Sequence, residues 1–154
     1  MNRKPILCLG FDGVIHSYTS GWKGADVISD APVPGALDFI IAALPDFEVH
    51  IFSSRSHQPG GRAAMQEWLR KHMVEALSTF MSPNLAAARA DVKVLQKIQW
   101  PIEKPSAMVT LDDRALTFTG EWPSIESLLA FKPWNKRPSS VNASSPPPPS
   151  KQQS

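Results

Sequence analysis

The sequence has little of what builds a disulfide-stabilised or membrane-spanning protein. Its 154 residues include one cysteine, Cys8, so an internal disulfide is excluded, and the apolar run around it predicts a buried thiol. No stretch approaches the roughly 20 apolar residues that span a bilayer. The apolar run 6–9 is also too short for the core of a signal peptide. These features predict a cytoplasmic protein with no membrane partner.

The chain also has no large net charge of either sign. The sign of its small net charge depends on residues 135–154. The formal net charge is +2, but residues 135–154 contribute three basic side chains and no acidic one. The rest of the chain has 13 basic and 14 acidic side chains, a net charge of −1. A basic nucleic-acid groove is therefore not indicated on that part. Because 135–154 holds five prolines and six serines, we expect a disordered tail after a single domain over 1–134.

Short apolar runs alternate with amphipathic stretches along this domain. The apolar run at 5–10 is typical of a strand buried in a parallel sheet, 48–52 and 107–111 are further strands, and 92–100 could supply a short one. Helical patterns follow Pro34, Gly60 and Pro83, and another covers 124–131. A polar stretch at about 15–32 predicts a small flap. The alternation predicts an α/β fold of three layers, α/β/α, around a Rossmann-like parallel sheet.

Polar side chains follow three of the predicted strands. They are Asp12, then Ser53 and Arg55, then Asp112, Asp113 and Arg114. Since the carboxyl ends of parallel strands meet at one edge of a sheet, these groups are expected to converge there. Clustered carboxylates favour a hard divalent cation, Mg²⁺ first, and a cation beside hydroxyl and guanidinium donors binds phosphate. The pattern indicates phosphoryl-transfer chemistry.

Four short motifs carry a resemblance to a known family. They are Asp12-Gly13-Val14, Ile51-Phe52-Ser53, Lys104-Pro105 and Leu111-Asp112-Asp113. In this order, and spread over about residues 5–131, they resemble the motifs of the haloacid dehalogenase-like (HAD-like) phosphohydrolases, in particular the small, nearly capless members. The resemblance implies the HAD-like fold, a Mg²⁺ cofactor and hydrolysis of phosphomonoesters.

The resemblance also implies a role for each matching residue. In the family's first motif, Asp-x-Asp, the first aspartate attacks phosphorus and the second is the general acid/base. Here the first place is Gly10, which has no side chain to attack with, so the chain is expected to be inactive or impaired. The resemblance implies that Asp12 is the general acid/base and gives the metal its backbone carbonyl. It implies that Asp112 and Asp113 are metal ligands. It also implies that Ser53 hydrogen-bonds the phosphate and that Lys104 neutralises the phosphate charge.

Substrate recognition is expected to involve the residues around these motifs. Arg55, Arg114 and His16 are the candidate substrate-binding residues, and either arginine could instead pair with the acidic cluster. His16 shares the flap region with Tyr18 and Trp22, where an aromatic side chain stacks on a base or packs within the flap. A site without a large cap suits a nucleotide, a nucleic-acid end or another bulky phosphorylated molecule.

Other interpretations of the same residues stay open. The chain could bind a phosphorylated ligand or nucleotide without turnover, or bind a protein partner through Pro146 to Pro149 in its tail. Asp112 and Asp113 could cap a helix without any metal. The lysine role could fall on Lys93 or Lys97, although Lys104 has the better position just before a strand.

Overall fold

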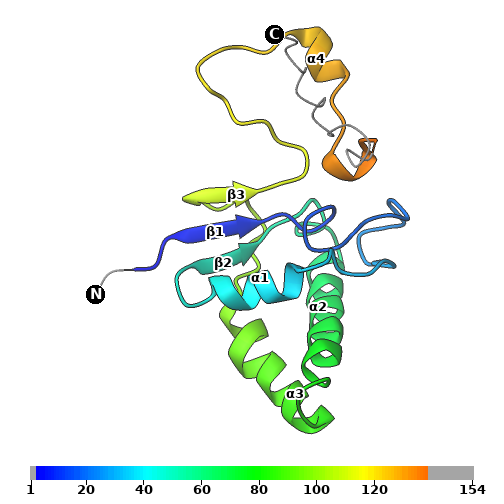
Figure 1. Cartoon of the computed structure of the whole chain (residues 1–154), viewed down its shortest axis with the longest axis vertical. Helices are drawn as coiled ribbons and strands as arrows, with labels where there is room; N and C mark the ends of the chain where they lie inside the picture. The colour runs from blue at the N-terminus through cyan, green and yellow to red at the C-terminus, as the bar shows by residue number, and fades with distance from the viewer. Residues whose placement is uncertain (1–2, 139–154) are drawn as a thin grey trace, which may run out of the picture. The chain divides into compact units, whose positions relative to one another are not determined.

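The computed structural model describes residues 3–138, in which strands and helices alternate (Figure 1). The chain divides into two compact units, Met1–Thr117 and Phe118–Ser154. The elements are β1 (Ile6–Leu9), α1 (Ala36–Ala43), β2 (Glu48–Ile51), α2 (Gly61–Leu77), α3 (Pro83–Arg89), a π-helix (Ala90–Val94), a 3₁₀-helix (Leu95–Lys97), β3 (Val109–Leu111), α4 (Ile125–Leu129) and a second 3₁₀-helix (Trp134–Lys136). The Pro146 to Pro149 run lies outside the described residues.

The first unit is built on a parallel sheet of three strands in the order β2-β1-β3. The central strand β1 pairs with both neighbours, and Leu9 near its carboxyl end lies opposite Ile51 of β2 and Leu111 of β3. All three strands therefore end at the same edge. The predicted α/β class with a parallel sheet is confirmed.

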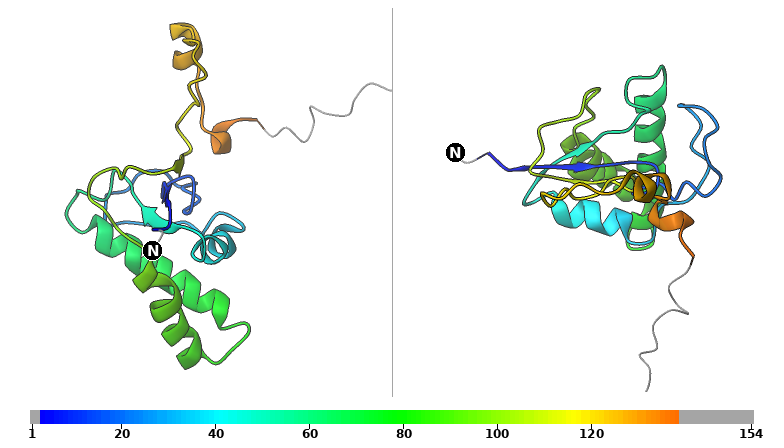
Figure 2. Two further views of the ribbon diagram at one scale, coloured as in Figure 1. Left: turned by 90° about the vertical axis from the view of Figure 1, so that its left-hand side faces the viewer. Right: turned by 90° about the horizontal axis from the view of Figure 1, so that it is seen from above.

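Helices cover both faces of this sheet, with α1 and α2 on opposite sides (Figure 2). The apolar run of β1 follows from this arrangement, because Leu7, Cys8 and Leu9 are all buried although successive side chains point to opposite faces. Ile40 of α1 and Leu69 of α2 belong to the same core cluster as the strands. The edge strand β3 differs from the buried strand expected over 107–111, because Val109 and Leu111 are 44% and 40% exposed.

The strand expected over 92–100 is wrong except at one residue. A continuous helical segment runs to Lys97, since Ala86, Ala90 and Val94 recur every fourth residue and are all buried. Only Gln99 pairs with the sheet: its N–H donates to Val49 O at 2.9 Å, and its carbonyl accepts from Ile51 N at 3.0 Å.

The second unit, described to residue 138, is small and open. Helix α4 confirms the helix expected near 124–131, and Ser124 caps it by accepting a hydrogen bond from Ser127 N at 3.1 Å. The rings of Phe118 and Trp122 pack with centroids 4.8 Å apart. The limit that the sequence suggests at residue 134 falls inside this unit. In the described part of the chain, no helix has the length and apolar character needed to cross a membrane.

Candidate functional site

The ends of the three strands are held side by side by the sheet's own hydrogen bonds. Gly10 N donates to Leu111 O at 2.9 Å, and Phe52 N donates to Leu9 O at 3.1 Å. The residues that leave β1, β2 and β3 are therefore neighbours. They border a cavity of about 510 Å³, within the size range of small-molecule sites.

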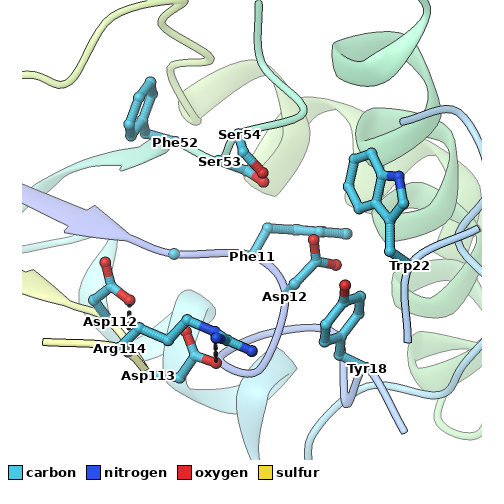
Figure 3. A pocket seen from close by; sticks show the side chains of 11 residues that line it. Phe11, Asp12, Tyr18, Trp22, Phe52, Ser53, Ser54, Asp112, Asp113 and Arg114 are labelled. Atoms are coloured by element: carbon cyan, nitrogen blue, oxygen red, sulfur yellow. Dashed lines mark hydrogen bonds and ion pairs between the residues drawn. The ribbon is translucent and has the colours of Figure 1, made fainter. Parts of the chain in front are cut away.

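The cavity combines carboxylates, hydroxyls, one guanidinium and aromatic rings (Figure 3). Its lining residues are Gly10, Phe11, Asp12, Tyr18, Trp22, Phe52, Ser53, Ser54, Asp112, Asp113 and Arg114. Five of the residues expected from the strand-end argument are thus together: Asp12, Ser53, Asp112, Asp113 and Arg114. Gly10 borders the same cavity.

Ser53 lies in a tight turn directly after β2. Its backbone N–H donates to Ser56 Oγ at 3.0 Å, and its own Oγ accepts from Arg55 N at 3.2 Å. The second bond uses an acceptor site on Oγ, so the hydroxyl proton remains for an oxygen in the cavity. This geometry suits a hydrogen bond to a phosphoryl group.

The acidic pair after β3 is partly neutralised by its neighbour. Arg114 N donates to Asp112 Oδ1 at 2.9 Å, and Arg114 Nε lies 3.9 Å from Asp113 Oδ2. Burial raises the pKa of Asp113, and the adjacent carboxyl of Asp112 raises it further. Two carboxylates that repel each other beside a cavity are the electrostatic setting that a divalent cation relieves.

Asp12 differs from this pair because its carboxylate already has strong partners. Arg55 Nε donates to Oδ2 at 2.9 Å, Arg55 Nη2 donates to Oδ1 at 3.1 Å, and His16 Nδ1 lies 2.9 Å from Oδ1. Burial alone raises the pKa of Asp12, but the hydrogen bonds from His16 and Arg55 outweigh it and hold the pKa below its usual value. Asp12 is therefore ionised at neutral pH.

Arg55 is fully buried and joins Asp12 to the flap. Besides its two bonds to Asp12, Nη1 donates to the carbonyls of Gly24, Ala25 and Val27 at 2.7, 2.9 and 3.1 Å. Its Cζ also lies 4.6 Å from the centroid of the Trp22 ring. Arg55, a candidate substrate-binding residue, therefore lies behind the cavity wall, and its N–H groups donate to Asp12 and to the flap.

His16 is likewise buried and contributes to the base of the flap. Asp30 N donates to Nε2 at 3.1 Å, so Nδ1 carries the proton that is shared with Asp12. Trp68 Nε1 donates to Asp30 O at 3.0 Å and fixes the same segment to α2. Like Arg55, His16 acts on Asp12 and the flap and does not border the cavity.

Lys104 is exposed and is not among the residues that border the cavity. Its charge does reach the interior of the sheet. Burial raises the pKa of the Cys8 thiol, whereas the hydrogen bond with Thr110 and the positive charge of Lys104 act in the opposite direction. Asp112, which does border the cavity, also acts on this thiol and raises its pKa.

The aromatic part of the cavity was only partly visible in the sequence. Tyr18 and Trp22 come from the flap and Phe52 from the end of β2; Phe52 had no chemical signal that would single it out. Tyr18 has a φ of 60°, a left-handed conformation that is uncommon for a residue with a bulky side chain. Such strain is typical of side chains held in place for function.

The two glycines of the first loop differ in what they require. Gly13 has a φ of +77°, and a Cβ there would collide with the Asp113 carboxylate, so only glycine fits. Gly10 has no such constraint. A Cβ at Gly10 would lie 3.1 Å from Val14 Cγ2 and 3.3 Å from Leu111 O, so both neighbours must shift by a few tenths of an ångström to admit it. The backbone conformation of Gly10 is open to other residues, and the room for a side chain depends on these shifts of Val14 and of the Leu111 main chain.

The donor set fits Mg²⁺ through two carboxylates. Within residues 3–138, no three His, Cys, Asp or Glu side chains are grouped to hold a metal ion. Mg²⁺ in phosphate sites is commonly held by one or two carboxylates, with waters and phosphate oxygens completing its shell. Asp112 and Asp113 meet that requirement. The Asp12 carboxylate, engaged by Arg55 and His16, leaves its backbone carbonyl as the contribution that the family resemblance implies.

The chain matches no protein-family model, no curated protein and no solved structure. The functional interpretation therefore depends on the geometry at the strand ends and on the motifs themselves.

The buried Arg55 predicts a large effect on stability. Replacing Arg55 with Met should lower the free energy of unfolding by about 3–5 kcal/mol, because the Asp12 carboxylate is left buried without its main partner. Urea unfolding followed by tryptophan fluorescence measures the change. Lys71→Met, at an exposed position of α2, should change it by less than about 0.5 kcal/mol. Equal, small losses in both variants would contradict the role assigned to Arg55.

The lowered pKa of Asp12 predicts a pH-dependent contribution to stability. An acid with a depressed pKa in the folded state stabilises the fold above its unfolded pKa of about 3.9, and this is lost as pH falls through the lower folded value. The stability difference between the unmodified chain and Asp12→Asn should be constant above about pH 5 and shrink below about pH 4. Urea titrations at several pH values test this. Asp46→Asn, at an exposed turn, is the control with little difference at any pH. A gap for Asp12→Asn that is independent of pH would show that its carboxylate is not stabilised as described.

Proposed function

We propose that this chain is a Mg²⁺-dependent phosphomonoester hydrolase of the HAD-like type whose turnover is abolished or impaired by Gly10. The observation that carries the proposal is the meeting of Asp12, Ser53 and the Asp112–Asp113 pair around one cavity, at the ends of three adjacent parallel strands. The parallel sheet with helices on both faces is compatible with the HAD-like fold that the motifs imply.

The residues around the cavity have complementary tasks in phosphate binding. The Ser53 hydroxyl donates to a phosphoryl oxygen, and the exposed Arg114 guanidinium is a second donor, a cationic one, at the rim of the cavity. Asp112 and Asp113 hold Mg²⁺, which supplies charge neutralisation to the phosphoryl group when bound. Asp12, fixed by Arg55 and His16, faces the cavity one residue beyond Phe11 as an ionised carboxylate.

The missing step is nucleophilic attack on phosphorus. Gly10 occupies the position between the β1 end and Asp12, next to Asp112, whose Cα lies 3.8 Å from where a Cβ at Gly10 would stand. A carboxylate introduced there would stand beside the metal-binding pair. Because the glycine backbone needs no special conformation, the substitution should preserve the fold.

The Gly10→Asp variant should therefore gain phosphatase activity. We expect a rise in kcat/KM of at least about 1000-fold with Mg²⁺, since a covalent nucleophile is usually worth that or more. Gly10→Asn is the matched control, with equal size and no nucleophile, and should remain inactive. Hydrolysis of a broad panel of phosphomonoesters, with and without a chelator, measures the effect. Equal activity of the unmodified chain and Gly10→Asp would place the nucleophile elsewhere.

The aromatic rings favour nucleotides or nucleic-acid ends as the phosphorylated substrate. Tyr18, Trp22 and Phe52 border the same cavity as Ser53 and Asp112, and Trp22 is 47% exposed. A base stacked on such rings gains about 1–3 kcal/mol. Tyr18 and Trp22 lie beside Asp12, whereas Phe52 lies apart from them, beyond Ser53 and Ser54 (Figure 3). The rings of Tyr18 and Trp22 therefore offer a planar group a surface next to the polar residues.

Loss of the flap aromatics should therefore affect nucleotide substrates selectively. In the Gly10→Asp background, Tyr18→Ala should raise KM for nucleoside monophosphates by about tenfold, and leave KM for a small alkyl phosphate within about twofold. Tyr18→Phe retains the ring and should behave like the parent. Steady-state kinetics on both substrate classes test this. Equal effects on the two classes would remove Tyr18 from substrate recognition.

A second candidate function is binding of a phosphorylated ligand without turnover. It is favoured by Gly10 together with the engagement of the Asp12 carboxylate by Arg55, because both reduce catalytic capacity while Ser53, Arg114 and the acidic pair remain available. Mg²⁺-dependent binding of a nucleotide that stays intact, with no activity in Gly10→Asp, would support this function over hydrolysis.

A further inference from the structure

A second concave surface lies at the opposite end of the first unit, where the strands begin. It is a groove of about 380 Å³ between the start of β1, the end of α1, the end of α2 and the helical segment that follows α3. Lys4 directly precedes β1, so this groove and the strand-end cavity are separated by the length of the strand, about 13 Å for four residues.

The floor of the groove is apolar. Ile41, Leu44, Pro45, Leu77 and Val94 form it, and Ile41 is 40% exposed. An exposed apolar surface in a concavity is typical of a place where another molecule binds.

The rim of the groove is basic. Lys4, Arg89, Lys93 and Lys97 line it, and no acidic residue of the described chain does. Lys4 Nζ donates to Leu44 O at 3.0 Å, which holds one charge over the floor. Within the described residues, the nearby carboxylate of Asp91 pairs with Arg70 and not with these cations. The groove therefore concentrates positive charge that is not neutralised in the structure.

Three of the cations form a row. Arg89, Lys93 and Lys97 recur every fourth residue of the helical segment, and all three line the groove. The helix changes here from α to π to 3₁₀, and Val94, at the last change, has φ −126° and ψ −71°. Irregular turns of this kind recur at functional positions.

We propose that this groove, lined by Lys4, Arg89, Lys93 and Lys97 above an apolar floor, binds an acidic amphipathic peptide segment of a protein partner. A partner helix with apolar residues on one face and acidic residues flanking them would place the former on the floor and the latter along the row of cations. Charge complementarity selects this occupant, since an extended row of cations matches a repeated acid better than it matches one headgroup.

The other occupants fit less well. Single-stranded nucleic acid needs aromatic rings on which bases stack, and the groove has none. A membrane surface is engaged by apolar side chains that protrude, whereas these form a hollow.

The test uses the full chain and a short fluorescein-labelled amphipathic peptide with leucines on one face and glutamates beside them. Fluorescence anisotropy should show saturable binding that weakens as salt rises. The double variant Lys93→Glu/Lys97→Glu should weaken binding by at least about tenfold, and Lys71→Glu, a single charge reversal outside the groove, by less than about twofold. Ile41→Ser should also weaken binding while circular dichroism confirms that the fold is retained.

Several results would overturn the proposal. Equal binding of the same peptide with lysine in place of glutamate would show that charge does not select the ligand. Equal effects of Lys71→Glu and of the double variant would move the interaction away from the groove. Binding of decanoate or of anionic vesicles, with no binding of the acidic peptide, would assign the groove to a lipid. None of these readouts depends on phosphatase activity, so the proposal stands or falls independently of the strand-end site.

Discussion

The buried interaction between Arg55 and Asp12 is the constraint on which the candidate site depends. The Arg55 guanidinium donates to the Asp12 carboxylate and to three carbonyls of the flap, and it stacks on the Trp22 ring. A buried cation is costly unless all of its donors are paired, and here each edge of the guanidinium has an acceptor. The flap has little regular structure of its own, and this arginine holds it in place together with His16, which accepts from Asp30 N, and Trp68, which donates to Asp30 O.

The same interaction explains why the three carboxylates at the strand ends are not equivalent. Burial raises the pKa of Asp12, but the hydrogen bonds from His16 and Arg55 outweigh it and lower the pKa, whereas burial and the neighbouring Asp112 raise the pKa of Asp113. Under the proposed function, a cation in the cavity would gain most at the Asp112–Asp113 pair. Asp12 is engaged by Arg55 and His16, and within the described residues it does not form a three-carboxylate metal group with that pair.

Much of this arrangement follows from the sequence, and the part that does not has a physical reason. Side chains after Ile51 and Leu111 must meet those after Leu9 once the strands are parallel, so Asp12, Ser53 and Asp112 were predictable. The direction of a long side chain is different, because it depends on a turn. The hydrogen bonds within residues 53–56 form a turn from which the Arg55 side chain reaches Asp12 and the flap. No residue spacing in the sequence predicts that turn. The position of Lys104 just before a strand favours it for the role in phosphate neutralisation that the resemblance implies. That position fixes where its backbone lies but not where its flexible side chain points. The strand expected over 92–100 failed because an apolar run fits a helix face as well as a buried strand.

Under the proposed function, Gly10 removes the group that would attack phosphorus but leaves in place the groups that would bind phosphate. The cavity wall holds three carboxylates, of which Arg55 and Arg114 partly neutralise Asp12 and Asp113. A fourth carboxylate at position 10 would add repulsion towards a phosphate dianion until a cation is present. With glycine there, that repulsion is absent, while the Ser53 hydroxyl and the Arg114 guanidinium are kept. Under the proposed function, loss of the nucleophile and retention of a phosphate-binding surface are compatible in one fold, because the attacking group and the binding groups would come from different strand ends.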